Sequence, residues 1–262
     1  MALLLSAHLQ AAVTTQAHPL TFSSHGLKLA ATWHAAEPQP GRILIVQVPG
    51  FAQWKDSRSM LLVTSLLTPT ADVLSLDMRG NGASEGAYTF GAEEARDVQA
   101  AVAALPRSYS RIAFLGMSMG AYISLRAAAE GPLRPWRLLL VSCPTSFEGI
   151  ASSWAMVAHP FDMLFHKKRH FVVPPQANPY FHWGPMFLEK PSGVDLAPRL
   201  SCPVAFLVGY KDSLVFASLS RAVFNAAPEP KTWELWRDGL HAEAMALQHP
   251  ERFQAWVKRA LK

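Results

Sequence analysis

Cysteine is scarce in this sequence: 262 residues include only Cys143 and Cys202. Two thiols cannot build a disulfide framework or a cysteine-based zinc site. If Cys143 closes one parallel strand and Cys202 opens the next, they lie at opposite ends of a sheet, out of bonding distance. We therefore expect reduced thiols and a cytoplasmic location.

Charged residues and long apolar runs are also few. Only 16% of the residues are charged and 50% are hydrophobic, which is typical of a well-buried globular protein rather than a disordered or fibrous one. No stretch approaches the roughly 20 uninterrupted apolar residues that a membrane span requires. Residues 1–17 carry no Lys or Arg before their apolar start and make a poor secretory signal. We expect a soluble protein without a membrane span.

The excess of positive charge is modest, with a net charge of +5 and a pI near 9.4. The densest basic run, residues 166–170 (HKKRH), is too short for a nucleic-acid footprint and has no recognisable binding motif beside it. We interpret it first as a solvated surface. The sequence therefore predicts no nucleic-acid partner.

Strand and helix patterns alternate along most of the chain. Turn residues at 23–26 predict a hairpin over residues 19–34, and the β-branched run at 42–48 is typical of a parallel strand buried on both faces. Further strands are expected at 71–76, 111–116, 136–142, 204–209 and 231–236, and helices at 60–67, about 98–105, 121–130, 215–226 and 251–261. The pattern predicts an α/β fold with a doubly wound, mostly parallel sheet. It is interrupted between residues 144 and 199, in a segment rich in Pro, His and aromatic residues.

One pentapeptide fits the nucleophile pattern G-x-S-x-G. Residues 116–120 read Gly-Met-Ser-Met-Gly, directly after a predicted strand and before a predicted helix. A serine on such a sharp turn crowds the residues two positions to either side, and glycine relieves the crowding because it has no Cβ. The alternative is an ordinary tight crossover with an incidental serine. The strand-turn-helix setting favours Ser118 as the nucleophile of an enzyme that cleaves an acyl bond.

A serine hydroxyl needs a base to take its proton and a carboxylate to orient that base. Asp212 follows the predicted strand at 204–209, and His241 follows the one at 231–236. Taken singly, such an Asp is more often a helix cap and such a His a core or surface residue. Both, however, lie at carboxyl ends of strands, where open α/β sheets assemble their sites. Asp238, in the loop of His241, is the nearest rival acid.

Acyl transfer also needs N–H donors for the oxyanion. The residue after the nucleophile, Met119, supplies one backbone N–H. Pro49-Gly50-Phe51 ends the strand at 42–48, and Gly50 permits close backbone approach, so the N–H of Phe51 is the second candidate. A plain Pro-Gly turn is the alternative. Such a mechanism needs no metal or organic cofactor, and no phosphate-cradling glycine loop is evident.

Taken together, these residues resemble an α/β-hydrolase over nearly the whole chain. The matching features are Pro49-Gly50-Phe51, residues 77–86 (DMRGNGASEG), the Ser118 turn, Asp212 with Val215, and His241. The chain is most similar to the group of serine aminopeptidases, monoacylglycerol lipases, cinnamoyl esterases and acyl-transfer thioesterases. Such proteins usually carry His-Gly where this sequence has Pro49-Gly50.

The resemblance implies roles for the remaining segments. Residues 144–199 would be an inserted cap, and residues 1–143 and 200–262 the hydrolase core. Residues 77–86 would form a structural loop beside the site, outside the reaction machinery. The aromatic residues of the cap are expected either to pack it onto the sheet or, in part, to line an apolar acyl pocket. They are Trp154, Phe161, Phe165, Phe171, Tyr180, Phe181, Trp183 and Phe187.

The predicted function is hydrolysis of a carboxylic ester or thioester of a small, apolar acyl substrate, through an acyl-enzyme on Ser118. Three alternatives remain open. The basic run 166–170 would dock the phosphates of coenzyme A or a carrier protein in a thioesterase. An aminopeptidase or amidase would use the same triad, with a cap carboxylate (Glu148, Asp162, Glu189 or Asp195) holding the substrate's amino terminus. A non-catalytic, ligand-binding homologue would need no triad at all.

Overall fold

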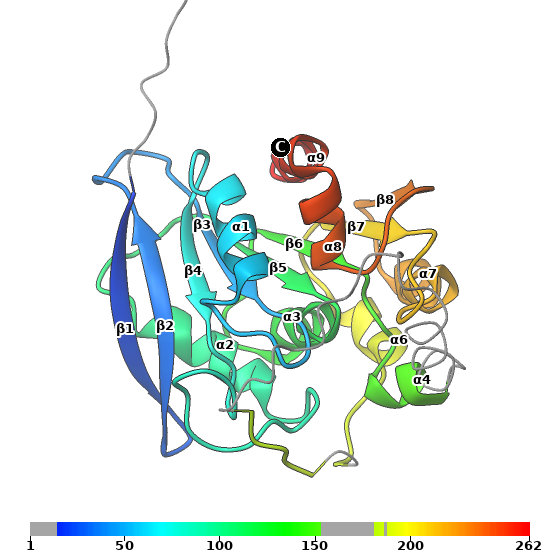
Figure 1. Cartoon of the computed structure of the whole chain (residues 1–262), viewed down its shortest axis with the longest axis horizontal. Helices are drawn as coiled ribbons and strands as arrows, with labels where there is room; N and C mark the ends of the chain where they lie inside the picture. The colour runs from blue at the N-terminus through cyan, green and yellow to red at the C-terminus, as the bar shows by residue number, and fades with distance from the viewer. Residues whose placement is uncertain (1–14, 153–180, 186–187) are drawn as a thin grey trace, which may run out of the picture.

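A single eight-stranded sheet organises the chain. The computed structural model describes residues 15–152, 181–185 and 188–262 (Figure 1). The strands lie in the order β1-β2-β4-β3-β5-β6-β7-β8. They are β1 (Gln16–Ser24), β2 (Leu27–Ala35), β3 (Leu44–Val48), β4 (Asp72–Leu76), β5 (Ile112–Met117), β6 (Arg137–Val141), β7 (Val204–Gly209) and β8 (Lys231–Trp236).

The pairing directions confirm the predicted fold class. β1 and β2 form an antiparallel hairpin, and β2 also pairs antiparallel with β4. Every other neighbouring pair, from β4 through β3 to β8, is parallel. The carboxyl ends of β3 and β5 to β8 therefore meet at one edge of the sheet, which is where an open α/β sheet builds a site.

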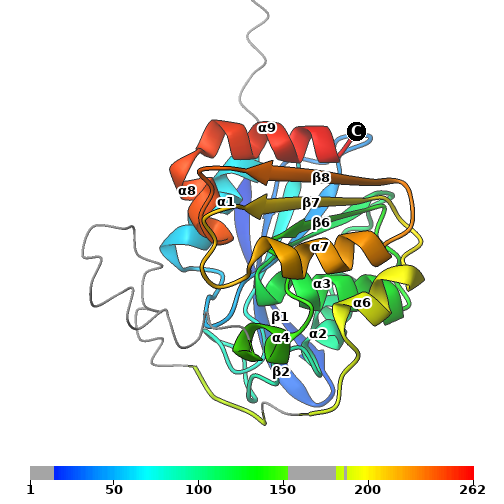
Figure 2. The ribbon, with the colours of Figure 1, turned by 90° about the vertical axis from the view of Figure 1, so that its right-hand side faces the viewer.

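Helices cover both faces of the sheet (Figure 2). One face carries α1 (Arg58–Leu67), α8 (Glu243–Gln248) and α9 (Pro250–Ala260), and the other carries α2 (Glu94–Ala103), α3 (Met119–Glu130) and α7 (Ala217–Ala226). Between β6 and β7 the described residues add the short α4 (Phe147–Ser152), α6 (Gly193–Leu196) and the 3-10 helix η1 (Ala197–Arg199).

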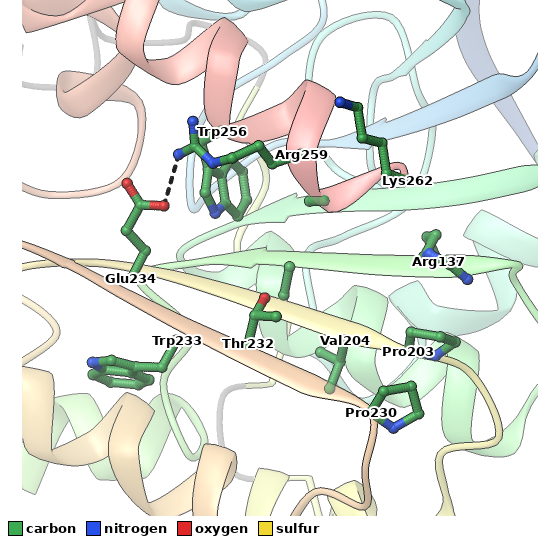
Figure 3. A pocket seen from close by; sticks show the side chains of 12 residues that line it. Arg137, Pro203, Val204, Pro230, Thr232, Trp233, Glu234, Trp256, Arg259 and Lys262 are labelled. Carbon is green, nitrogen blue, oxygen red and sulfur yellow. Dashed lines mark hydrogen bonds and ion pairs between the residues drawn. The ribbon is translucent and has the colours of Figure 1, made fainter.

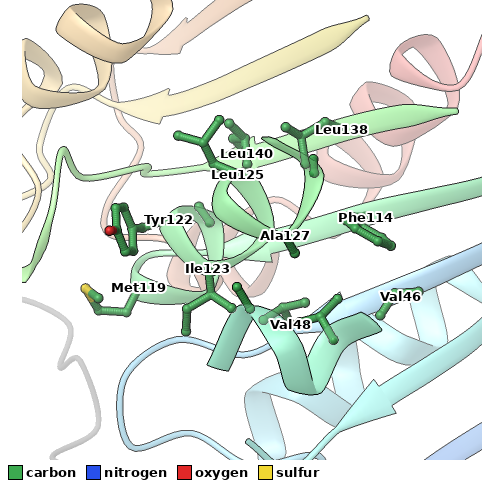
Figure 4. Close-up of a cluster of buried hydrophobic side chains, with 14 of the residues drawn as sticks. Val46, Val48, Phe114, Met119, Tyr122, Ile123, Leu125, Ala127, Leu138 and Leu140 are labelled. Atoms are coloured by element: carbon green, nitrogen blue, oxygen red, sulfur yellow. The ribbon is translucent and has the colours of Figure 1, made fainter. Parts of the chain in front are cut away.

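The central strands are buried on both sides. All five residues of β3 are buried; Leu44 and Val46 pack toward α2 and α3, whereas Ile45 packs toward α1. Figure 4 shows side chains of α3, including Ile123 and Leu125, against those of β3, β5 and β6. Two-sided burial explains why residues 42–48 read as a continuous apolar run rather than an alternating one.

Several element boundaries differ from the sequence prediction by a few residues, and the short helices α4, α6 and η1 were not predicted. The helix expected at 121–130 begins at Met119, because Ser118 itself ends the strand-to-helix turn. The helix α8 was not predicted, since six residues directly after His241 are too few to show helical periodicity.

Other expectations concern the thiols and membrane spans. Cys143 and Cys202 are buried free thiols. In the part of the chain that the structure describes, no helix has the length and apolar character to cross a membrane.

Candidate active site

Ser118 lies on a strained turn between β5 and α3. Its φ of 54° and ψ of −123° are rare for a residue other than glycine. A Cβ on Gly116 would lie 2.3 Å from the carbonyl oxygen of Gly120, and a Cβ on Gly120 would lie 2.3 Å from those of Val48 and Pro49. Only glycine fits both positions, so the two glycines of the motif allow α3 to begin directly against the loop after β3.

Asp212 is fixed by the backbone that follows it. Its side chain is fully buried in the loop after β7, and Oδ1 accepts hydrogen bonds from the N–H groups of Leu214 at 2.9 Å and Val215 at 2.8 Å. Both oxygens also face the ring of His241, at 2.9 and 2.8 Å from Nδ1. The carboxylate therefore holds the imidazole with Nδ1 protonated and leaves Nε2 as the basic nitrogen.

The environment of His241 favours its protonated form. Burial acts to lower the pKa of this imidazole, but the charge and hydrogen bond of Asp212, together with the charge of Glu243, outweigh burial and raise the pKa above its ordinary value. A base with a raised pKa takes a proton more readily from a serine hydroxyl.

The Ser118 turn and the His241 loop are both anchored at the end of β6. The N–H of Ser118 donates to the carbonyl of Val141 at 2.9 Å, and the N–H of Ala242 donates to Ser142 Oγ at 3.0 Å. The structure thus brings Asp212 and His241 into direct contact and anchors Ser118 and the His241 loop to adjacent residues. Among the described residues, no hydrogen bond joins Ser118 Oγ to His241, a contact that often tightens only when substrate is bound.

The loop that carries Phe51, one of the two expected oxyanion donors, reaches the nucleophile, and Met119 follows Ser118 directly in the chain. A Cβ built on Gly50 would be 3.4 Å from Ser118 Cβ, so the loop after β3 touches the nucleophile. The N–H groups of Phe51 and Met119 donate to no acceptor within the described ranges. Two unpaired donors close to a serine hydroxyl have the character of an oxyanion hole.

Sequence reasoning missed one charged group at this edge of the sheet. Oε1 of Glu243, the first residue of α8, accepts a hydrogen bond from the N–H of Gly50 at 3.3 Å. The sequence signal for Glu243 is its position two residues after His241. The acid that the sequence offered as a rival to Asp212 was Asp238. Asp238 instead forms ion pairs with His249 at 2.9 Å and Arg252 at 3.2 Å.

Comparison with known proteins shows the family of the chain. Residues 43–260 match the sequence profile described as the alpha/beta hydrolase family. The chain belongs to the alpha/beta hydrolase family. No curated protein sequence is similar enough to match the chain.

Solved structures of other alpha/beta hydrolases share the fold at low sequence identity. The esterase Pf2001 from Pyrococcus furiosus superimposes with a TM-score of 0.68 at 20% identity, over 95% of this chain and 94% of its own. A hydrolase from Pseudomonas aeruginosa PA01 gives 0.68 at 18% identity, over 94% and 98%. Est816, described as an N-acyl homoserine lactone degrading enzyme, gives 0.66 at 19% identity, over 91% and 99%.

An aromatic cluster lies against the loop after β3 of this alpha/beta hydrolase. It surrounds Phe51, whose ring centre is 5.5 Å from that of Phe90, 5.2 Å from Phe181 and 5.5 Å from Trp183. Backbone hydrogen bonds hold Phe181 and Trp183 there, because Tyr88 bonds to His182 at 2.8 Å and to Gly184 at 2.9 Å. The cluster comprises Phe51, Tyr88, Phe90, Phe147, Phe181 and Trp183.

Several residues singled out in the sequence lie outside the described part of the chain. They are the basic run 166–170, Asp162, and the aromatic residues Trp154, Phe161, Phe165, Phe171, Tyr180 and Phe187. Of the aromatic residues expected in the cap, the structure describes Phe181 and Trp183, and the indole of Trp183 is 61% exposed.

The carboxylate of Asp77 accepts the hydrogen bonds that hold the loop at residues 77–86. Asp77 accepts hydrogen bonds from the N–H groups of Lys55 at 2.8 Å and Ala83 at 3.0 Å. A Cβ on Gly82 would lie 2.3 Å from Asp77 Oδ2, so the loop closes tightly over this carboxylate. These contacts agree with the structural role that the family resemblance implied.

Two cavities of the described part of the chain are lined by residues other than the expected triad. One of about 350 Å³ opens between β7, β8 and α9, and Glu234 and Arg259 form an ion pair at its rim (Figure 3). A second, of about 500 Å³, lies near Asp72. Within the described ranges, no group of His, Cys, Asp and Glu side chains has the arrangement of a metal site.

Proposed function

We propose that this alpha/beta hydrolase cleaves a carboxylic ester or thioester through an acyl-enzyme on Ser118. The observation that carries the proposal is the buried hydrogen bond between His241 Nδ1 and Asp212, at the sheet edge where Ser118 occupies its strained turn. Their chain order, Ser, Asp, His, is that of the nucleophile-elbow enzymes.

The reaction follows from the position of each group. His241 Nε2 accepts the proton of Ser118, whose Oγ attacks the acyl carbon. The oxyanion of the tetrahedral intermediate accepts hydrogen bonds from the N–H groups of Phe51 and Met119. The imidazolium then protonates the leaving alcohol or thiol as the carbon–heteroatom bond breaks. Water, activated by the same imidazole, releases the acid and restores Ser118.

An apolar acyl group fits the surroundings of the oxyanion loop. The aromatic cluster contains Phe51, the residue that would donate to the oxyanion. The ring of Phe51 contacts that of Trp183, which is exposed. Aromatic rings next to a reacting carbonyl favour apolar chains by burying them from water. We include in the proposal that residues 144–199, which contain Phe181 and Trp183, act as a cap over the core formed by residues 1–143 and 200–262.

Two of the three described cap carboxylates, Glu148 and Asp195, give little support to an aminopeptidase, and the third, Glu189, is exposed. Glu148 binds Lys190 Nζ at 2.6 Å, and Asp195 accepts from the backbone of Ser192 in the capping box of α6. Both are therefore engaged elsewhere, and a substrate's amino terminus would have to displace these contacts.

A fluorophosphonate probe tests the catalytic assignment without knowledge of the substrate. The wild-type protein should become labelled at Ser118, and Ser118→Ala should not be labelled while keeping the wild-type circular dichroism spectrum. An unlabelled, folded wild-type protein would favour the non-catalytic, ligand-binding alternative.

A substrate panel tests the acyl preference. We expect kcat/KM to rise from p-nitrophenyl acetate toward longer acyl chains, and Trp183→Ala to lower it for long chains by about tenfold while sparing acetate. Trp136→Ala, which removes a partly exposed indole at the amino end of β6, is the matched control. The panel should include acyl-coenzyme A and, because Est816 is described as degrading them, N-acyl homoserine lactones. A profile restricted to acetate would contradict an apolar acyl site.

A further inference from the structure

A second carboxylate, that of Glu243, reaches the candidate active site from α8. Its Oε1 accepts the N–H of Gly50 at 3.3 Å. A Cβ added to Gly50 would lie 2.8 Å from this oxygen and 3.4 Å from Ser118 Cβ. Gly50 thus lies close to both the nucleophile turn and the Glu243 carboxylate.

The hydrogen bonds of Gly50 fix the peptide that carries an oxyanion donor. Its N–H is held by Glu243, and its carbonyl oxygen accepts from the N–H of Gln53 at 3.2 Å. That carbonyl belongs to the same planar peptide unit as the N–H of Phe51, so orienting one orients the other. Glu243 therefore acts on the direction of the Phe51 N–H through one intervening residue.

The same carboxylate acts on the base. Asp212, from the loop after β7, contacts the His241 ring, and Glu243 lies two residues after His241 at the start of α8. Both favour the protonated imidazole. In the described part of the chain, Glu243 forms no ion pair.

We propose that Glu243 is a positioning residue of the triad: it ties the oxyanion loop to the His241 loop and stabilises the imidazolium that forms when His241 takes the Ser118 proton. This inference rests on the proposed serine hydrolase chemistry. It assigns Glu243 two separable effects, one through the hydrogen bond to Gly50 and one through its charge.

Two substitutions separate these effects. Glu243→Gln keeps an acceptor for the Gly50 N–H but removes the charge, whereas Glu243→Ala removes both. Asp238→Asn is the matched control, because it removes one negative charge from the same loop at a side chain that pairs with His249 and Arg252. The readouts are the rate of Ser118 labelling by a fluorophosphonate from pH 5 to 9 and the NMR titration of the His241 imidazole.

We expect the acid limb of the labelling profile and the NMR midpoint of His241 to move to lower pH in Glu243→Gln and Glu243→Ala, and to stay in place in Asp238→Asn. The plateau labelling rate should fall by about tenfold in Glu243→Ala, the effect of one lost hydrogen bond on the oxyanion loop, and by less in Glu243→Gln. The glutamine variant, which differs little in shape, guards against a folding defect in the alanine variant.

The contrary outcomes are equally specific. An unshifted His241 titration in Glu243→Gln, or an equal shift in Asp238→Asn, would overturn the proposal. If the wild-type protein is not labelled at all, the serine hydrolase assignment fails, yet the NMR titration of His241 still tests whether Glu243 acts on the imidazole.

Discussion

Two buried carboxylates, Asp72 and Asp212, belong to opposite ends of the parallel sheet and are used differently. Asp72 is the first residue of β4, and Asp212 follows the last residue of β7. Both side chains are fully buried. Asp72 is bound by Arg42, by Arg107 at 3.1 Å and by the hydroxyl of Tyr109 at 2.6 Å. Within the described ranges, the one titratable side chain paired with Asp212 is the imidazole of His241.

The partners decide what each acid does. Burial acts to raise the pKa of Asp72, but the hydrogen bonds from Arg42 and Tyr109 outweigh it, and the pKa of this carboxyl is lowered. Arginine stays protonated at every ordinary pH, so the Asp72 site is closed and contributes to stability. Asp212 faces a group that titrates near neutrality, so its site can exchange a proton. The acid at one end of the sheet is paired with permanent cations, whereas the acid at the other end is paired with a group that can gain and lose a proton.

The largest expected effect is the loss of reactivity in Asp212→Asn. An amide can still accept the N–H groups of Leu214 and Val215, but it no longer favours the required tautomer and charge of His241. We expect the labelling rate of Ser118 to fall by about 10⁴-fold, with little change in the urea midpoint. A variant that loses stability but keeps its labelling rate would reverse the comparison.

The converse change is Asp72→Asn. It leaves the buried Arg42 guanidinium without its counter-ion, and breaking a buried pair from one side costs about 3 kcal/mol of unfolding free energy. The measurement is urea denaturation, with Ser118 labelling under native conditions as the control. Labelling per folded molecule should match the wild type, because Asp72 lies at the far end of the sheet from Ser118. A large loss of labelling in folded protein would contradict the division of roles.

A finer test removes one hydroxyl at each end of the sheet. Tyr109→Phe deletes the hydrogen bond to Asp72 and the acceptor of Trp33 Nε1 at 3.0 Å, and should cost about 2 kcal/mol because one partner is ionised. Tyr210→Phe is the matched control, since this ring is 69% exposed just after β7. Equal urea midpoints for the two variants would show that the Asp72 site is not a special source of stability.

The sequence predicted the fold more completely than the site. Residues 42–48 and 204–209 carried their strand signal because a strand buried on both faces must be apolar throughout. The assignments of Ser118, Asp212 and His241 came from the order of motifs after strands. The sequence did not predict the role of Glu243, because its hydrogen bond to Gly50 joins residues 193 positions apart in the chain. The Asp72 site was also not foreseen, since nothing local distinguishes a buried acid that opens a strand from an exposed one.

The smallest effect is the response of Ser118 labelling and of stability to pH. It distinguishes the two ends of the sheet within the wild-type protein. The pKa of His241 is raised, so its basic form is lost as the pH falls through a value above the ordinary 6.5, and labelling of Ser118 should drop by about tenfold per pH unit below it. Over this range the free energy of unfolding should not fall, because a group whose pKa is raised in the folded state stabilises that state when it is protonated.

The pKa of Asp72 is lowered in the folded protein. Its contribution to the free energy of unfolding is therefore present above the pKa of an unfolded Asp, about 3.9, and is lost only as the pH falls below that value. Labelling rates and urea midpoints measured from pH 3 to 9 should therefore decline in two separate windows. A common midpoint for both would mean that reactivity is lost through unfolding rather than through His241.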